Sequence, residues 1–392
     1  MSDEKDVVEK GETEEVTPAP APTPAPSPAP RPRTVRQWVV IRGGSMDLRV
    51  GEGILPETAN ILRASAGRPH SCALLHEEEA PDDVVRTLHD NLCAAGFSVQ
   101  TAPVDFAACD LAAVCELDAL LGEMRVTCDD VVVMVGGFKE LSVASFACST
   151  WCGGVPLAEV PLDIASAVAA PTTPRALDVA GMPRMVVQDA TARFAFVDLD
   201  LLAADPASDE ALLAFALMAQ TAMCDSDRSF GQLWDVADQL ASGDREALAE
   251  QLKNTLKSRG KVSSATSAAL RQSLEFGTTF ARALRELAPS VSAATALADG
   301  MRFATRLGVV LEALSVDDML AVDELLERLG IGTTSATVDP AELVARIRDE
   351  RLGRTNRFML AVPRALGRVR LSVMTDETIL EHASAWCASR PA

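Results

Sequence analysis

The sequence predicts an α/β domain of nucleotide-binding type followed by a mainly helical domain. The chain of 392 residues is too long for one ordinary domain and long enough for two separate cores. From Trp38 to about residue 200, short β-rich segments alternate with amphipathic helical ones. After Asp198 the β signal fades and helical patterns dominate. The predicted domains are therefore residues 35–200 and 201–392, preceded by a tail over residues 1–34.

The tail has two parts of biased composition. Residues 1–16 are acidic and polar, whereas residues 17–33 alternate proline with small residues. Proline removes backbone donors and favours an extended polyproline II conformation, so we expect a stiff, disordered tether. A ligand for a proline-binding domain is the less favoured alternative, because Pro-Ala repeats lack the side chains that confer specificity.

Four short segments of the first domain have the β-branched, apolar composition of strands. An amphipathic stretch over Asp82–Ala95 separates the second segment from the third. The order strand, helix, strand favours right-handed crossovers and hence a parallel sheet. The four predicted strands are Val39–Ile41, Ser71–Leu75, Ser98–Ala102 and Val131–Val135.

The second domain carries helical periodicity, which predicts an all-α bundle. Two sets of apolar or small residues step by four and three, so each set should share one helix face. Ser315 with Asp318 resembles the capping box that begins a further helix. The two sets are Leu270, Leu274, Gly277, Ala281 and Leu284, and Leu297, Met301, Ala304, Gly308 and Leu311.

The strongly acidic balance excludes several classes of partner. Net charge is −20, and residues 1–36 contribute only −2, so about −18 belongs to the folded part. Such a surface repels the phosphates of nucleic acids and of anionic membranes. A small anionic substrate would need a local basic pocket.

The cysteines and the absence of apolar runs predict a cytoplasmic protein. The nine cysteines are odd in number and scattered, and we interpret them as small buried hydrophobic residues in a reducing compartment. No apolar run approaches the roughly 18 residues that span a bilayer, and the acidic N-terminus is unlike a signal peptide.

One turn has the form of a phosphate-binding site. The strand Val131–Val135 ends in Gly136-Gly137-Phe138, where a Rossmann-type fold places a tight turn whose amides approach a pyrophosphate. Two glycines are a weak motif, and a plain turn after a strand is favoured on local sequence alone.

Several such weak matches occur in an order that resembles the 3-dehydroquinate synthase family, over about residues 35 to 380. Between Val131 and Val179, the pairs Gly136-Gly137, Phe146-Ala147 and Val160-Pro161 fit the family signature. The further matches are Ala80-Pro81, Val197-Asp198, Leu274–Phe280 for "LNxGHTF", Gly300-Met301 for the end of "HGEAVxxGM", and Asp349-Glu350-Arg351 followed by Phe358-Met359-Leu360 and Gly367 for the terminal hairpin.

The resemblance implies a dehydroquinate-synthase-like fold with a zinc site, which this chain lacks. Family members hold zinc with one Glu and two His, and by alignment these ligands fall at Ala265, Thr278 and Ala293. A methyl group cannot coordinate zinc and a Thr hydroxyl is a poor ligand, so we expect no zinc. The four His residues are not placed by sequence to rebuild the site; they are His70, His76, His89 and His382.

The resemblance also implies NAD bound at the glycine turn. The candidate cofactor residues are Gly136, Gly137 and Glu77, the last because the ribose-contacting Asp of the family falls at the adjacent His76. Against NAD, Asp163 places a carboxylate where a phosphate wants neutral donors. Most other family roles are substituted: by alignment they fall at Ser142, Leu162, Ala169, Arg175 (in place of Lys), Ala216 and Ala219.

Lys257 and Arg271 match family positions that contact substrate, and they are the retained catalytic candidates. The alternative interpretation places both bases on solvated helix faces. A phosphate pocket would require the two side chains to converge.

Three hypotheses follow from these matches. The leading one is a non-catalytic or repurposed homologue that binds a protein partner or a second copy of itself. The second is a divergent but active 3-dehydroquinate synthase, an NAD- and metal-dependent lyase acting on an anionic sugar phosphate in the shikimate pathway of aromatic amino acid biosynthesis. The third is a nucleotide-binding sensor that keeps NAD without chemistry.

Overall fold

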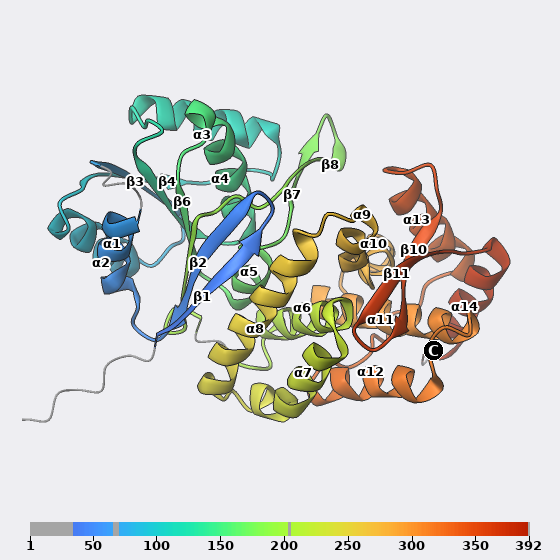
Figure 1. The fold of residues 1–392 in the computed structure, drawn as a ribbon. Helices are drawn as coiled ribbons and strands as arrows, with labels where there is room; N and C mark the ends of the chain where they lie inside the picture. The colour runs from blue at the N-terminus through green and yellow to red at the C-terminus, as the bar shows by residue number, and fades with distance from the viewer. Residues whose placement is uncertain (1–33, 66–69, 203–204, 391–392) are drawn as a thin grey trace, which may run out of the picture. The chain divides into compact units, whose positions relative to one another are not determined.

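The computed structural model describes residues 34–65, 70–202 and 205–390 (Figure 1). The tail predicted over residues 1–34 lies, except for Thr34, outside this part of the chain. Within the described ranges, no helix combines the length and the apolar composition needed to cross a bilayer.

A seven-stranded sheet forms the first half, in the order β1-β2-β9-β6-β5-β3-β4. All four predicted strands are confirmed, each slightly longer than expected. The strands are β1 (Val35–Ile41), β2 (Gly44–Gly51), β3 (Ser71–Glu77), β4 (Ser98–Val104), β5 (Val131–Gly136), β6 (Leu157–Pro161) and β9 (Phe194–Asp198).

The sheet is parallel, as predicted, except at one edge, where the sequence did not reveal an antiparallel strand. β1 pairs antiparallel with β2, while β2 pairs parallel with β9. Only Arg42 and Gly43 separate the two edge strands, and Gly43 has φ of 84°. So short a connection can join only antiparallel neighbours, because a parallel pair needs a long crossover.

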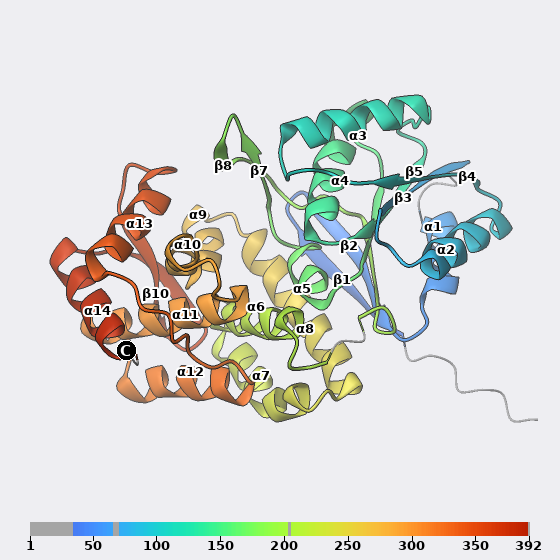
Figure 2. The same ribbon diagram turned by 180° about the vertical axis from the view of Figure 1, so that it is seen from behind.

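Helices cover both faces of the sheet (Figures 1 and 2). α1 (Leu55–Ser65) and α2 (Asp82–Ala94) pack on one face, and α3 (Leu111–Glu123) and α4 (Phe138–Thr150) on the other. Every residue of β5 is buried, as expected for a central strand covered on both sides.

The strand order changes direction between β3 and β5, and this point positions the site. β4 lies on one side of β3, whereas β5 and then β6 lie on the other. In open α/β sheets, ligands bind beyond the carboxyl ends of the strands at such a switch point. Here those ends are Glu77 on β3 and Gly136 on β5.

The second half is mainly helical, but the expectation of an all-α bundle is wrong in one respect. A hairpin of β10 (Met359–Ala365) and β11 (Arg368–Val373) interrupts the helices, as the family resemblance implied. A second hairpin, β7 (Arg175–Val179) with β8 (Met182–Gln188), belongs to the first half. The helices are α5 (Ile164–Ala169), which precedes the β7–β8 hairpin, and α6 (Asp209–Asp225), α7 (Asp227–Ala241), α8 (Arg245–Ser263), α9 (Ala268–Arg271), α10 (Thr278–Leu287), α11 (Ala293–Val310), α12 (Val316–Arg328), α13 (Pro340–Leu352) and α14 (Asp376–Ala388).

Of the two predicted helix faces, one is confirmed and one is broken. α11 carries the second set up to Gly308, and Ser315 caps α12 by accepting a 3.0 Å hydrogen bond from the Asp318 amide. The first set is split, because Gly277 has φ of 77° and α10 begins only after it. The apolar spacing continues across a backbone turn that it cannot reveal.

The cysteine interpretation is partly wrong. All nine cysteines are free, but only three are buried: Cys72, Cys148 and Cys224. Cys93, Cys115, Cys128 and Cys152 are exposed. Their helical or apolar sequence context did not distinguish an inward from an outward position.

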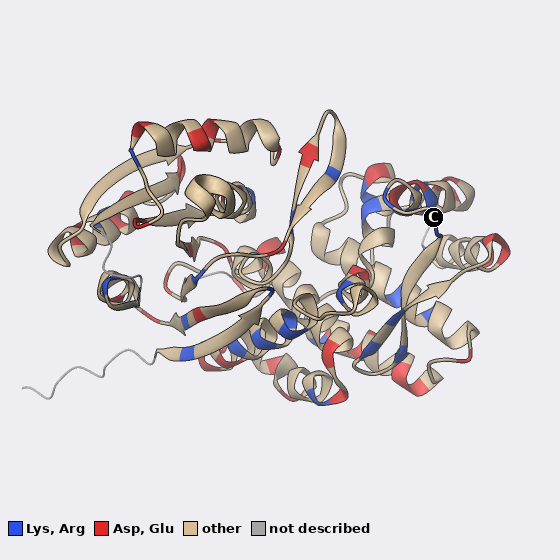
Figure 3. Cartoon of the chain, turned by 45° about the horizontal axis from the view of Figure 1, so that its top comes forward, with Lys and Arg blue, Asp and Glu red and all other residues tan. Residues whose placement is uncertain are grey.

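Asp and Glu are distributed over both halves and interspersed with Lys and Arg (Figure 3).

Candidate functional site

The glycine turn lies at the switch point of the sheet, and its anion-binding amide is already engaged. α4 begins directly after Gly137, so the turn presents the N-terminus of a helix. The Gly137 amide donates a 2.7 Å hydrogen bond to Oε2 of Glu77. A helix N-terminus favours an anion, and here the anion is the protein's own carboxylate.

Three carboxylates surround the turn. A Cβ built on Gly137 would lie 3.5 Å from Oε2 of both Glu77 and Glu140, and 3.8 Å from Oδ2 of Asp163. Glu140 is buried beside Lys139, and Asp163 caps α5 through the Ser166 amide at 2.7 Å. A pyrophosphate at this turn would meet these negative charges rather than free donors. The side chains present therefore do not fit a dinucleotide.

The environment of Glu77 disfavours its charged form. Burial raises the pKa of Glu77, and the neighbouring carboxylates of Glu140 and Asp163 raise it further, against the lowering effect of the Gly137 amide. The sequence identified Glu77, Gly136 and Gly137 as one group, and the structure brings them together. Their assignment to a cofactor stays a prediction.

Glu77→Gln is expected to raise the thermal midpoint at neutral pH by about 1–2 °C. The side-chain oxygen of the glutamine can still accept the hydrogen bond from the Gly137 amide, but the side chain carries no charge. Because the pKa of Glu77 is raised on folding, the native state binds more protons, and stability falls as pH rises above the ordinary glutamate range. The difference between variant and wild type should vanish below that range. Calorimetry at several pH values measures this difference in thermal midpoint. The control is Glu78→Gln, because Glu78 is the exposed neighbour of Glu77. Equal shifts of the midpoint in the two variants would contradict the prediction.

Behind the turn, Arg175 is committed to a buried ion pair. Its Nη2 donates to Oε1 of Glu159 at 2.6 Å, and both side chains are fully buried. Its guanidinium carbon lies 5.5 Å from the centre of the Phe138 ring. Arg175, which replaces the family's loop Lys by alignment, therefore supports the strand beneath the turn. Sequence reasoning missed Glu159, although an acidic residue inside the apolar strand Leu157–Pro161 was a usable signal.

The positions aligned with the zinc ligands hold no metal donors. Thr278 has its hydroxyl in a 3.0 Å hydrogen bond from Gln220, and Ala293 opens α11 behind its cap Ser292. The carbonyl of Ala265 accepts from Arg271 at 2.6 Å. Across residues 34–65, 70–202 and 205–390, no group of three or more His, Cys, Asp or Glu side chains could hold a metal ion. The residues do not fit zinc at this place.

A buried cation is linked to one of these positions, Thr278, through a single side chain. Arg259 on α8 donates to the hydroxyls of Thr173 at 2.8 Å and Thr221 at 2.9 Å, and to Oε1 of Gln220 at 3.3 Å. Gln220 in turn donates to Thr278. Burial lowers the pKa of Arg259 to about 10, which leaves it charged at neutral pH. A buried guanidinium linked to Thr278 through one side chain opposes a divalent cation there by charge repulsion. The sequence did not reveal Arg259, because an Arg in a helix is usually exposed.

The two retained catalytic candidates share no hydrogen-bond partner among the described residues. Lys257 is exposed on α8, and among the described residues it has no hydrogen bond or ion pair. Arg271 is half-buried, and its Nη1 donates to the carbonyls of Ala265 and Thr266 at 2.6 and 3.0 Å. Their role in substrate binding stays a prediction.

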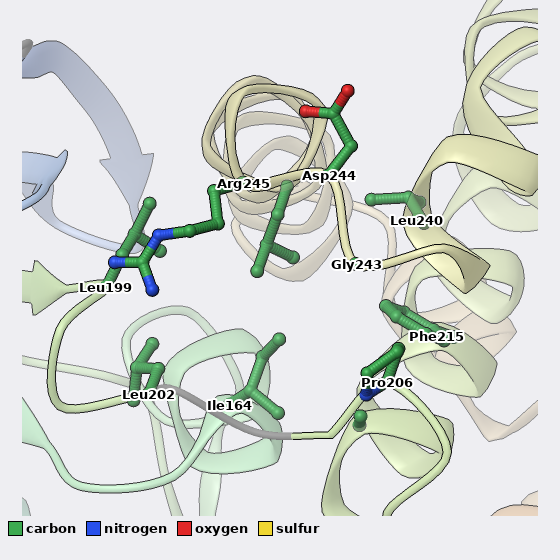
Figure 4. A pocket seen from close by; sticks show the side chains of 11 residues that line it. Ile164, Leu199, Leu202, Pro206, Phe215, Leu240, Gly243, Asp244 and Arg245 are labelled. Carbon is green, nitrogen blue, oxygen red and sulfur yellow. The ribbon is translucent and has the colours of Figure 1, made fainter.

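A small apolar pocket between α5, α6 and the start of α8 offers no chemistry (Figure 4). Its volume is about 50 Å³, enough for one or two water molecules. Two charged side chains line it, and both are engaged. Asp244 accepts from the amides of Glu246 and Ala247, and Arg245 pairs with Glu52 at 2.5 Å and with Asp200 at 2.6 Å.

Comparison with known proteins agrees with the fold. No family model matches the chain. The chain is 28% identical over 313 residues to the 3-dehydroquinate synthase of Corynebacterium efficiens, covering 77% of this chain and 84% of that protein. It is 22% identical over 351 residues to the enzyme of the same name from Corynebacterium jeikeium, covering 86% of this chain and 92% of that one.

Solved structures of cyclases share the whole architecture. A 2-deoxy-scyllo-inosose synthase complexed with carbaglucose-6-phosphate, NAD+ and Co2+ superposes with a TM-score of 0.76 at 15% identity, covering 89% of this chain and 99% of that one. The 2-epi-5-epi-valiolone synthase of Streptomyces hygroscopicus, with NAD+ and Zn2+ bound, gives 0.74 at 16%, covering 91% and 100%. The resemblance to 3-dehydroquinate synthases found in the sequence is thereby confirmed, and the chain has the fold of these two synthases.

Proposed function

We propose that this protein is a non-catalytic homologue of 3-dehydroquinate synthase, whose scaffold serves a binding role. The proposal rests mainly on three substitutions at the aligned metal site: donor side chains are replaced by Ala265, Thr278 and Ala293. In addition, the Arg259 cation is linked to Thr278 through Gln220. Zinc requires thiolate, imidazole or carboxylate donors.

The nucleotide site supports the same proposal. The cyclases with the same fold carry NAD+ in their structures. In this chain Glu77 takes the amide of Gly137, and two further carboxylates face the turn. This arrangement also counts against the hypothesis of an NAD sensor, because such a sensor needs the same amides free for a phosphate.

A divergent active lyase is the second candidate, favoured by the relatives' names and by the retained bases Lys257 and Arg271.

The rate of phosphate release from the family's seven-carbon sugar phosphate, with NAD and zinc supplied, distinguishes the two candidates. The Corynebacterium efficiens enzyme serves as the positive control. We expect a rate at least about 10⁴-fold below that of the control, since charge stabilisation by a metal supplies several kcal/mol. A rate within about a hundredfold of the control would overturn the proposal.

The binding role requires a macromolecular partner, which we propose to be a second copy of the chain or another protein. Light scattering of the purified protein separates a dimer from a monomer. A monomer directs the search to a different protein.

A further inference from the structure

A second cavity lies in the helical half, away from the glycine turn. Its volume is about 230 Å³, and it is enclosed by α11, α14 and the segment after α12. Arg302 on its wall is nine residues beyond Ala293, about 13 Å further along α11. The lining polar residues are Arg302, Arg306, Thr333, His382, Ser389 and Arg390.

Positive charge exceeds negative charge around this cavity. Arg306 pairs with Asp323 at 2.8 Å. Asp299, which is fully buried, is shared between Arg302 at 3.4 Å and Arg390 at 3.6 Å. Three guanidiniums therefore face two carboxylates, inside a protein whose overall charge is −20. His382 adds a ring nitrogen that can donate a hydrogen bond.

Arg390 is buried without the hydrogen bonds that its donors require. Its side chain is 8% exposed, yet among the described residues none of its guanidinium nitrogens donates a hydrogen bond, and Nε is fully enclosed. The guanidinium carbon lies 4.2 Å from the ring centre of Trp386, which fixes its plane. The ring nitrogen of Trp386 is likewise buried and unpartnered. These two enclosed nitrogens cannot face the cavity, because no water-sized group reaches them. The terminal nitrogens of Arg390 are not enclosed and have no hydrogen-bond acceptor among the described residues, so an acceptor is missing there.

The other arginines in the wall are satisfied by the protein itself. Arg302 donates to the carbonyls of Ile331 and Gly332, each at 2.8 Å. These two hydrogen bonds hold the segment after α12 against α11 and fix the shape of the cavity. The hydrogen-bonding capacity that is left for a ligand is thus confined to the α14 side, at Arg390.

We propose that this cavity binds a small oxyanion, a phosphate or a carboxylate, with the two terminal guanidinium nitrogens of Arg390 as its donors. Guanidinium and oxyanion form short, charge-assisted hydrogen bonds, and two adjacent donors give the geometry specificity. The volume suits one such group with a few water molecules and is below that of ordinary cofactor sites. The proposal is independent of whether the superfamily's reaction is retained.

The electrostatics of Arg390 agree with a missing anion. Burial lowers the pKa of Arg390, Asp299 opposes that effect, and the cations Arg302 and Arg306 add to it. A bound oxyanion would supply the compensating charge that one shared carboxylate does not.

Calorimetric titration of the full chain tests the proposal, with inorganic phosphate and acetate as separate probes and chloride holding ionic strength constant. Saturable binding of phosphate, of acetate or of both is expected, and whichever binds identifies the oxyanion class. Arg390→Met keeps the apolar stem but removes the charge, and it should weaken binding at least about tenfold. Arg390→Lys keeps the positive charge but removes the planar pair of terminal nitrogens, for a loss of about threefold.

The matched control is Arg328→Met. Arg328 also stacks on a tryptophan, with its guanidinium carbon 4.8 Å from the Trp234 ring, and pairs with Asp238 at 2.8 Å, but it does not line the cavity. Its variant should bind within about twofold of wild type. Absence of saturable binding in the wild type, or an equal loss in the Arg328 and Arg390 variants, would overturn the proposal. If Arg390→Met does not fold, Arg390→Lys decides alone.

Discussion

Gly300→Ala is expected to lower the free energy of unfolding by about 3 kcal/mol or more. A Cβ on Gly300 would lie 2.0 Å from the carbonyl oxygen of Gly277 and 2.8 Å from its carbonyl carbon. Both obstacles are backbone atoms, so no side-chain rotation relieves the overlap. α10 and α11 would have to separate, and the aromatic contact of Phe280 with Phe303, 4.7 Å between ring centres, would be disturbed.

Gly231→Ala is the control for this prediction. Gly231 lies inside α7, and nothing stands within 4 Å of a Cβ built on it. There alanine should stabilise by roughly 0.5–1 kcal/mol, from helix propensity. Urea unfolding of both variants measures the contrast. A loss below about 1 kcal/mol for Gly300→Ala would mean that the two helices do not approach so closely.

Arg175→Met is expected to destabilise the fold by about 3–5 kcal/mol, because it leaves Glu159 buried without its partner. The double variant Arg175→Met, Glu159→Gln should recover most of that loss, since no charge then remains buried. Such recovery would show a strong coupling between the two sites. Arg245→Met, at a partly exposed ion pair, should cost no more than about 1 kcal/mol.

The loss in Arg175→Met should depend on pH. Burial raises the pKa of Glu159, and Arg175 counteracts it. Without Arg175 the pKa rises further, so the native state binds more protons than the unfolded chain, and stability falls as pH rises above the ordinary glutamate range. The deficit should therefore be smallest in acid and largest at neutral pH. A deficit that is constant with pH in urea unfolding would contradict this explanation.

The sequence predicted the sheet well, because buried parallel strands are continuous apolar runs such as Val131–Val135. It did not predict the antiparallel edge, since one β-rich stretch contained both β1 and β2 with only Arg42 and Gly43 between them. The break before α10 was also hidden, because the apolar spacing persists through Gly277. Its left-handed backbone is set by contact with α11, which is tertiary information.

The sequence predicted which residues form the candidate site, but not the hydrogen bonds and ion pairs that they make. Glu77, Gly136 and Gly137 end adjacent parallel strands, so their proximity follows from topology. That Glu77 faces the Gly137 amide depends on side-chain packing, which spacing does not encode. The buried charges Glu159 and Arg259 were missed for a similar reason: charged residues are normally exposed, and only the folded chain shows what surrounds them.

The central claim, that the aligned metal site is lost, is tested most directly by zinc content. The purified protein is dialysed against a slight excess of zinc and then against metal-free buffer, and elemental analysis gives zinc per chain. We predict less than about 0.1 zinc per chain, because no donor set is present at the aligned positions. About one zinc per chain would contradict the claim and would establish that other side chains rebuild the site.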